Sequence, residues 1–496
     1  MPKESWETSF HLHPQTAWMN DPNGLCFFRG VYHAFYQYAP DWPADPLKHW
    51  GHATSTDLLH WNHESVALSP SVPEDTHGVF SGCTQVISHG AADGGEQMLV
   101  YYTGNVICPS PNHNPRDKSF VFAGREGNTI LVTSDDGMDF SDKEVLLHQA
   151  DYPDELSCHV RDPKVWEQDG SLHMVLGARS LRGAGCVLVY DSTDGRNWTY
   201  RHTIRSEYSF GYMWECPGIV QLEGLEFLMI SPQGLPRLSQ QWKNLWQSGY
   251  IALDTHLLET QLIDETRFVE WDRGHDFYAP QTFIDEHGRT ILIGWMGSFD
   301  ERLNSTPDGL SWCHCFTLPR ELTLNERGRI CQNPISELAD VRAHHRQLEL
   351  GTTHSFDSPS VDIECLGISG AGSLLVNHDV ELRIGATGLG QATVELVYLD
   401  AQVAQGRENR RIELDEDDCW GDFSSGFCGL NSLRLILDGS TLELYLNDGA
   451  VVMSSRWFSR SDARIEICMD IPCQQASGWE LCSSEEQGAH PVEQCA

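Results

Sequence analysis

The stretch STDLLHW at residues 55–61 contains a pattern that recurs twice further along the chain. A serine is followed two residues later by an aspartate and four positions after that by an aromatic residue. The copies are Ser55, Asp57 and Trp61; Ser134, Asp136 and Phe140; and Ser192, Asp194 and Trp198. An apolar run precedes each serine and a polar turn follows each aspartate, as in a hairpin that joins the outer strands of a sheet. One copy could arise in any all-β chain, but three copies in order favour a propeller over a sandwich.

The first 340 residues of the chain are predicted to be β-structure throughout. Short apolar runs such as VYHAFY at residues 31–36 and ILIGW at residues 291–295 alternate with turn residues. The repeats are spaced like four-stranded blades of about 40–50 residues or more, so five blades would fill this part of the chain. We therefore predict a five-bladed β-propeller at residues 1–340, with a short helix expected around residues 334–346.

The sequence changes character beyond residue 351. Polar and apolar residues alternate in VELRI at residues 380–384 and in LELYL at residues 442–446. This alternation is typical of strands with one wet face and one packed face, as in a β-sandwich. We predict a β-sandwich at residues 352–496, joined to the propeller by a short linker at residues 341–351. Because a low-complexity linker is missing, the two domains are expected to pack together.

The charge of the chain disfavours several classes of partner. There are 33 Lys and Arg residues against 71 Asp and Glu residues, a formal net charge of −38. Such a negative field repels phosphate backbones and anionic lipid headgroups, so neither nucleic acid nor membrane is an expected partner. The sequence also lacks a run of the ~20 apolar residues that a membrane span requires.

The cysteines and the first residues of the sequence favour a cytoplasmic location. Residues 1–15 show no basic segment followed by an apolar one, as a secretory signal would. The 16 cysteines are scattered, and we interpret them as buried free thiols in a reducing compartment. The pair Cys313 and Cys315 lacks a second pair at zinc-ligand spacing, so no metal site is predicted.

Three acidic residues in different expected blades are candidates for catalysis. Asp21 lies in WMNDPNG at residues 18–24, Asp162 in the triplet RDP at residues 161–163, and Glu215 in WECPG at residues 214–218. A following proline is expected to hold Asp21 and Asp162 in an extended conformation. Each could be an ordinary turn residue or surface ion pair, but the inner strands of a propeller would bring all three to one funnel.

Two such carboxyls suffice to cleave a glycosidic bond. A retaining enzyme uses one as nucleophile and one as acid, about 5–5.5 Å apart. Apolar surroundings formed by Trp18, Trp214 and Trp295 would raise the pKa of one carboxyl and leave the other ionised. We expect Glu215 to have the driest surroundings and to hold the proton.

These motifs, in this order, resemble the three signatures of glycoside hydrolase family 32, which holds invertases, inulinases, levanases and sucrose-phosphate hydrolases. Further matching stretches are FYQY at 35–38, WGH at 50–52, FSG at 80–82, DFYAPQ at 276–281 and GWM at 294–296. The resemblance covers the first ~320 residues, and the C-terminal part matches the family's sandwich only loosely. It implies a five-bladed propeller followed by a sandwich, and hydrolysis of sucrose or short fructo-oligosaccharides.

The resemblance also implies a role for each residue of the site. Asp21 would be the nucleophile, Glu215 the acid and base, and Asp162 the transition-state stabiliser. The implied substrate-binding residues are Asn20, Gln37, Trp42, Trp50, Phe80, Ser81, Arg161, Tyr278 and Trp295. The match shifts between Trp42 and Trp50, which leaves open which of these two lines the fructose site. The chemistry needs no metal and no cofactor.

The sequence leaves several alternative functions open. Within the family they are a sucrose-6-phosphate hydrolase, an inulinase or levanase, and transfer of fructose to a second sugar. Outside this activity they are a non-catalytic sugar-binding protein and another hydrolase on a five-bladed propeller, such as an arabinanase. The C-terminal domain could cover propeller surface, bind polysaccharide or form a homodimer.

Overall fold

The computed structural model describes residues 6–88, 90–92, 94–108, 124–307, 309–418, 426–461 and 464–482. The expected outer limits of the two domains, residues 1 and 496, lie outside these ranges. Nearly all of the regular secondary structure in the described chain is β-strand. Its short helices are α1 (Ala401–Ala404) and the 3₁₀ turns η2 (Pro73–Asp75), η3 (Gln149–Asp151), η4 (Glu265–Arg267), η5 (Ser336–Ala339) and η6 (Glu416–Asp418). Among the described residues, no helix has the length and hydropathy needed to cross a membrane.

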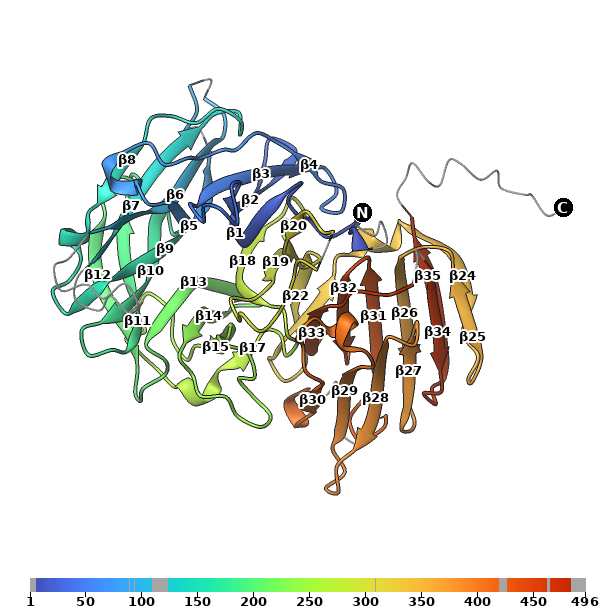
Figure 1. The fold of residues 1–496 in the computed structure, drawn as a ribbon. Helices are drawn as coiled ribbons and strands as arrows, with labels where there is room; N and C mark the ends of the chain where they lie inside the picture. The colour runs from blue at the N-terminus through green and yellow to red at the C-terminus, as the bar shows by residue number, and fades with distance from the viewer. Residues whose placement is uncertain are drawn as a thin grey trace.

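Residues 17–334 fold into five separate sheets arranged about a common centre (Figure 1). The first sheet contains, in order, β20 (Trp312–Cys313), β1 (Ala17–Phe28), β2 (Val31–Ala39), β3 (His49–Ser55) and β4 (Asn62–His63). The second contains β5 (Val79–Ile87), β6 (Gln97–Ile107), β7 (Arg125–Ser134) and β8 (Glu144–Leu147). The third contains β16 (Leu262–Ile263), β12 (Thr199–Ser206), β11 (Gly185–Ser192), β10 (Ser171–Ser180) and β9 (Leu156–Gln168).

The remaining two sheets complete this part of the chain. The fourth contains β13 (Met213–Leu222), β14 (Leu225–Gln233), β15 (Gly249–Ala252) and β17 (Val269–Glu270). The fifth contains β18 (Tyr278–Ile284), β19 (Thr290–Met296), β22 (Arg320–Leu324) and β23 (Ile330–Pro334), with β21 (Cys315–Phe316) paired to β19. One strand of each sheet contacts its counterpart in the next: β1 contacts β5, β5 contacts β9, β9 contacts β13, β13 contacts β18, and β18 contacts β1. These five inner strands therefore form a closed ring.

The three copies of the sequence repeat form the same turn in three of these sheets. Ser55 Oγ donates to Asp57 Oδ1 at 3.0 Å, and the same Oδ1 accepts the backbone N–H groups of Leu59 and His60. Asp136 and Asp194 accept the equivalent bonds in their copies. The turns join β3 to β4, β7 to β8 and β11 to β12, and the aromatic residue that follows packs against a hydrophobic core. The predicted outer hairpins are thus confirmed.

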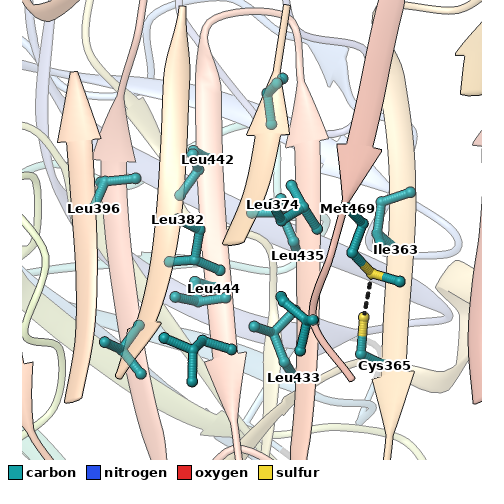
Figure 2. Close-up of a cluster of buried hydrophobic side chains, with 14 of the residues drawn as sticks. Ile363, Cys365, Leu374, Leu382, Leu396, Leu433, Leu435, Leu442, Leu444 and Met469 are labelled. Atoms are coloured by element: carbon teal, nitrogen blue, oxygen red, sulfur yellow. Dashed lines mark hydrogen bonds between the residues drawn. The ribbon is translucent and has the colours of Figure 1, made fainter. Parts of the chain in front are cut away.

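The C-terminal part consists of two six-stranded sheets packed face to face. The first contains β24 (Arg342–Gln347), β35 (Gln475–Leu481), β26 (Ser360–Leu366), β31 (Ser432–Asp438), β32 (Thr441–Leu446) and β33 (Val451–Arg456). The second contains β25 (Thr353–Phe356), β34 (Ile465–Met469), β27 (Gly372–Val376), β28 (Val380–Ala386), β29 (Ala392–Tyr398) and β30 (Arg410–Glu413). Alternate residues such as Leu382, Leu435 and Leu444 fill the space between them (Figure 2).

Two expectations about the junction differ from the structure. The helix expected around residues 334–346 is wrong, because this segment holds the end of β23, the 3₁₀ turn η5 and most of β24. The segment at 341–351, expected as a linker, contains β24 itself, which pairs with β35. Its single helical turn ends at Ala339, and the edge of a sheet offers the following residues backbone partners that an isolated helix would lack.

Buried charges join the two parts of the molecule. Arg320 on β22 is fully buried and contacts Asp272 at 3.2 Å and Glu443 of β32 at 2.7 Å. The His11 ring contacts Glu443 at 2.9 Å and Asp438 at 2.7 Å. Burial alone lowers the pKa of His11, but its bonds to Asp438 and Glu443 raise it to about 9. The two parts are therefore in direct contact through paired charges as well as through apolar side chains.

Candidate active site

The inner ring of strands is irregular at five equivalent positions. The pairing register shifts at residues 20–21 of β1, 81 of β5, 162–163 of β9, 216–217 of β13 and 279–280 of β18. Such bulges interrupt the alternation of side chains and turn a residue toward the end of a sheet, where active sites are often built. Each of the three predicted catalytic carboxyls lies in or beside one of these bulges.

The backbone at three of the bulges is left-handed. Asp162, Cys216 and Ala279 have φ values of 62°, 46° and 47°, and each precedes a proline. The extended conformation expected for Asp162 is therefore wrong. Its N–H donates to Thr103 Oγ1 at 2.9 Å, and the Ala279 N–H donates to Ser248 Oγ at 3.2 Å, so hydrogen bonds to neighbouring segments hold these two conformations. Proline disfavours the right-handed helical conformation for the residue before it. An extended conformation is one alternative, and in a bulge the left-handed conformation is another.

Asp21 is held by two hydrogen-bond donors. Ser81 Oγ donates to Asp21 Oδ2 at 2.7 Å, and Asn20 Nδ2 donates to Oδ1 at 3.0 Å. The Trp18 indole N–H in turn fixes Asn20 at 2.8 Å. Burial is the largest effect on Asp21 and raises its pKa, the two hydrogen bonds lower it, and the charge of Glu215 raises it again. The carboxylate is therefore oriented by its neighbours and close to a second acid.

Asp162 lies beside Asp21, with Cys216 between them. The Cys216 N–H donates to Asp162 Oδ2 at 3.0 Å. The Cys216 thiol lies 3.8 Å from Asp162 Oδ2 and 3.9 Å from Asp21 Oδ2. Burial raises the pKa of Asp162 to about 7, the Arg161 guanidinium acts against this rise, and the charges of Glu215 and Asp21 add to it. The structure thus brings all three predicted acids into one cluster.

Glu215 has four donors on its two oxygens. Arg161 donates to Oε1 through Nε at 2.9 Å and Nη2 at 2.6 Å. Gln233 Nε2 and the Tyr278 hydroxyl each donate to Oε2 at 2.6 Å. The Glu215 side chain is 16 % exposed and that of Asp162 7 %, so the expectation that Glu215 is the driest of the acids is wrong. Four donors therefore orient Glu215, which is more exposed than Asp162.

The tryptophans expected at the site have different positions. Trp42 and Trp18 line a cavity of about 720 Å³ together with Trp246 and Phe299. Trp50 is fully buried, and its indole N–H donates to the Phe80 carbonyl, so it belongs to the core rather than to this cavity.

The remaining predicted residues support or border the cluster. Trp295 is fully buried and packs with Tyr278 and Cys216, whereas Trp214 points into another core. Gln37 Nε2 donates to the Val79 carbonyl at 3.0 Å, next to the Phe80–Ser81 bulge. The half-buried ring of Phe80 lies 5.5 Å below the Arg125 guanidinium.

Sequence reasoning missed two residues of the site. Gln233 contacts Glu215 from the end of the neighbouring strand β14, and nothing in its local sequence marks it. Lys48 places its ammonium 5.0 Å from the Trp18 ring, and burial lowers its pKa to about 8 although the charge of Asp21 opposes this. Lys48 follows the segment at residues 43–47 where the match to the expected family shifts, which is the one signal that could have drawn attention to it.

Comparison with known proteins identifies the family. The profile of the glycosyl hydrolases family 32 N-terminal domain matches residues 11–334, and that of the family's C-terminal domain matches residues 394–471. The chain belongs to glycoside hydrolase family 32. It is therefore a glycoside hydrolase, and the acid cluster is the site at which its chemistry is to be sought.

Relatives from bacteria match this family 32 chain over nearly all of its length. A raffinose invertase of Escherichia coli is 36% identical over 462 residues, covering 93% of this chain and 91% of the relative. A sucrose-6-phosphate hydrolase of Escherichia coli is 34% identical over 456 residues, covering 92% and 90%. The family assignment therefore extends across both parts of the molecule.

Solved structures agree with this assignment. A family 32 β-fructofuranosidase of Bombyx mori is 30% identical with a TM-score of 0.77, covering 97% of this chain and 95% of that chain. A sucrose-6-phosphate hydrolase from Lactobacillus gasseri has a TM-score of 0.81 at 24% identity, covering 97% and 94%, and supports the fold alone.

Proposed function

We propose that this family 32 glycoside hydrolase is a retaining β-fructofuranosidase that releases terminal non-reducing β-D-fructofuranosyl residues from sucrose and short fructo-oligosaccharides. The observation that carries the proposal is the cluster in which Cys216 lies within 4 Å of both Asp21 and Asp162, while Arg161 lies 2.6 Å from Glu215 and 4.0 Å from Asp162. The names of the relatives support the substrate, and a variant of the Bombyx mori enzyme has been solved in complex with sucrose.

The scaffold of the proposed enzyme is a five-bladed β-propeller followed by a β-sandwich. The five sheets of residues 17–334 and the closed ring of their inner strands support five blades. Inner strands of a propeller converge on its central channel, which accounts for carboxyls from three sheets meeting at one place.

In the first step Asp21 attacks the anomeric carbon of the fructosyl unit. A carboxylate oxygen of Asp21 forms a bond to C2, the bond from C2 to the leaving oxygen breaks, and Glu215 donates its proton to that oxygen. The donors on Asp21 hold its attacking oxygen in place. The product of this step is an ester between fructose and Asp21.

In the second step water replaces Asp21. Glu215, now a carboxylate, accepts a proton from a water molecule whose oxygen attacks C2, and the bond to Asp21 breaks. Two inversions at C2 retain the β-configuration. Asp162 would hold ring hydroxyls as positive charge develops on the sugar, with Arg161 holding Glu215 beside it.

The cavity lined by Trp18, whose indole bonds to the Asn20 that holds Asp21, is suited to the leaving group. Its aromatic walls include Trp18, Trp42 and Phe299, and aromatic faces pack on the carbon faces of sugar rings. We assign Trp42 rather than Trp50 to substrate contact, because Trp50 is buried in the core. Asn20, Ser81, Arg161 and Tyr278 contact the acids, and Gln37, Phe80 and Trp295 stay among the proposed binding residues.

A substrate panel with detection of the product anomer tests this proposal. Initial rates of fructose release from sucrose, sucrose 6-phosphate, kestose and inulin are compared, and the first-formed anomer is followed by NMR. We expect sucrose and kestose to be cleaved with release of β-fructose, and inulin to be a poorer substrate. First formation of α-fructose, or no release from any of the four, would overturn it.

A second candidate within the same reaction is hydrolysis of sucrose 6-phosphate. Relatives of 31–36% identity carry that name, and basic residues lie near the leaving-group cavity despite the acidic character of the chain. The same panel separates the two functions, because a phosphate-dependent enzyme would show a much higher kcat/KM for the phosphorylated sugar than for sucrose.

A further inference from the structure

A second cavity lies between the two parts of the molecule, next to the cavity lined by Trp18 and Trp42. Its volume is about 290 Å³, and side chains from both parts line it. Residues 237–245 and 298–303 contribute from the first part, and residues 406–410 from the C-terminal part. Leu245, Ser298 and Asp300 are among the residues that line both cavities, so the two hollows share a wall.

Arg410 lines this interdomain cavity and has N–H groups that bond to no other group in the described chain. It is only 8% exposed, and its guanidinium donates to the carbonyls of Arg273 and Gly274 and to Asn244 Oδ1. These bonds use three of the five N–H groups that arginine carries. Within the described chain, no carboxylate lies within ion-pair distance of Arg410. A buried cation with donors to spare is costly unless an anion approaches it.

Lys243 adds a second cation at the same place. It is half-buried and donates to the backbone carbonyl of Arg411. Burial lowers its pKa and the charge of Arg410 lowers it further, whereas Glu270 and Glu413 act in the opposite direction from outside ion-pair distance. Two cations are thus held close together without a carboxylate bonded to either of them in the described chain.

Cations outnumber carboxylates along the cavity wall as a whole. Arg237 and Arg302 share the single carboxylate of Asp300, at 3.0 and 2.5 Å. With Glu408, the cavity has two carboxylates against four cations. Because the whole chain carries −38, a local excess of positive charge is unusual here and marks a place that an anion can occupy.

We propose that this interdomain cavity binds the phosphate group of a small ligand. A phosphate offers several acceptor oxygens to the free donors of Arg410 and the ammonium of Lys243, and arginine matches its geometry with paired donors. The shared wall places a phosphate bound here next to the cavity lined by Trp18 and Trp42. The group therefore belongs either to a separate phosphorylated ligand or to the substrate itself.

The test is calorimetric titration of the full chain with inorganic phosphate at constant ionic strength set by chloride. We expect saturable binding at one site in the wild-type protein. Lys243→Gln removes one charge-assisted contact and should weaken binding by about tenfold or more. Arg410→Gln should weaken phosphate binding further. If the loss of the Arg410 bonds to residues 244, 273 and 274 prevents folding, Lys243→Gln alone tests the proposal.

Arg411→Gln is the matched control. Arg411 is exposed, adjoins Arg410 in sequence and does not line the cavity, and its backbone carbonyl still accepts from Lys243 in the variant. Phosphate affinity should stay at the wild-type value. An equal loss in Arg411→Gln and Lys243→Gln would mean that phosphate responds only to overall charge, and would overturn the proposal.

Kinetics separate the two sources of the phosphate. If Lys243→Gln raises KM for sucrose 6-phosphate and leaves KM for sucrose unchanged, the phosphate belongs to the substrate. If both KM values stay unchanged while inorganic phosphate binding is lost, it belongs to a separate ligand. Absence of saturable phosphate binding in the wild type, together with unchanged KM values in Lys243→Gln, would overturn the proposal. None of the binding measurements depends on the proposed reaction.

Discussion

Cys216 is the residue on which the acid cluster is centred. Its N–H donates to Asp162, and its thiol lies within 4 Å of both aspartates. A thiol is a weak donor, so it occupies the space between two carboxyls without fixing a proton on either. Burial is the largest of several effects that raise the pKa of this thiol well above its usual value, so it stays protonated beside the acids.

Removal of the Ser81 hydroxyl should shift the pH dependence of catalysis. The bond from Ser81 to Asp21 favours the ionised carboxylate and lowers its pKa. In Ser81→Ala the pKa of Asp21 rises, so the acid limb of the kcat/KM profile should move to higher pH and kcat should fall by roughly tenfold or more. Ser141→Ala, which removes an exposed hydroxyl in the turn after β7, should leave the profile unchanged. An acid limb at the same pH in Ser81→Ala would contradict the contact with the nucleophile.

The raised pKa of Asp162 should lower the free energy of unfolding at neutral and alkaline pH. Its folded-state pKa of about 7 exceeds the value of about 3.9 expected in the unfolded chain. Its contribution to stability is therefore fully present below about pH 4 and is lost as the pH rises toward 7. Asp162→Asn should raise the free energy of unfolding by at least about 1 kcal/mol at pH ~8 and have little effect at pH ~4. Urea unfolding at both pH values checks this, and equal effects would contradict the raised pKa.

At the scale of elements, the five bulges of the inner strands set the positions of the active-site residues. Every inner strand loses its regular register where it reaches the site, and three of the bulged residues have positive φ. A regular strand would turn alternate side chains to the two faces of its sheet. The bulges instead bring residues from five sheets to the end of the ring.

Gly82 shows how little space these bulges leave. A Cβ at this position would lie 2.0 Å from the Tyr101 carbonyl oxygen, so β5 must shift and carry Ser81 with it. Gly82→Ala should lower the free energy of unfolding by about 2–4 kcal/mol and reduce kcat. Gly388→Ala is the control, because a Cβ there meets nothing within 4 Å. Similar melting curves for the two variants would show that the bulge is not tightly packed.

The elements were more predictable from sequence than the details of the site. The turns at Asp57, Asp136 and Asp194 follow from local side-chain bonds, which a sequence pattern can reveal. The contact of Gln233 with Glu215 depends on the register between β13 and β14, which no local pattern fixes.

Dependence on contacts between distant parts of the chain also explains the two predictions about the site that a local pattern could not settle. The left-handed backbone of Asp162 is held by Thr103 on another sheet. The choice between Trp42 and Trp50 required knowing that Trp50 on β3 points into a core. Such features depend on contacts between residues far apart in the chain, whereas the motif containing Asp21 is contiguous.

At the scale of the whole molecule, the two parts are joined by charges that have no access to water. Arg320, Asp272 and Glu443 have side chains that are 0% exposed. Buried charges of this kind require their partners, because each would be strongly destabilising alone. The C-terminal sheets therefore fix the outer strands of the fifth sheet as well as covering them.

Replacement of Arg320 should destabilise the molecule without a dependence on salt. Arg320→Met leaves Asp272 and Glu443 buried near each other, and should cost about 3–5 kcal/mol of unfolding free energy. Arg196→Met, which breaks an ion pair with partners 44% and 50% exposed, should cost about 0–1 kcal/mol. Denaturant unfolding at low and high salt measures both. A loss below 1 kcal/mol for Arg320→Met would mean that the interface does not depend on this network.

The proposed reaction depends on a bond between Asp21 and C2 of fructose. Loss of the general base should let this ester accumulate, so the Glu215→Ala variant is incubated with a fructoside whose leaving group needs no protonation, digested and analysed by mass spectrometry. We predict one fructosyl unit on the peptide that contains Asp21, and none in the Asp21→Ala, Glu215→Ala double variant. Turnover by Glu215→Ala without such an adduct, or an adduct on Asp162 instead, would contradict the assignment of Asp21 as the nucleophile.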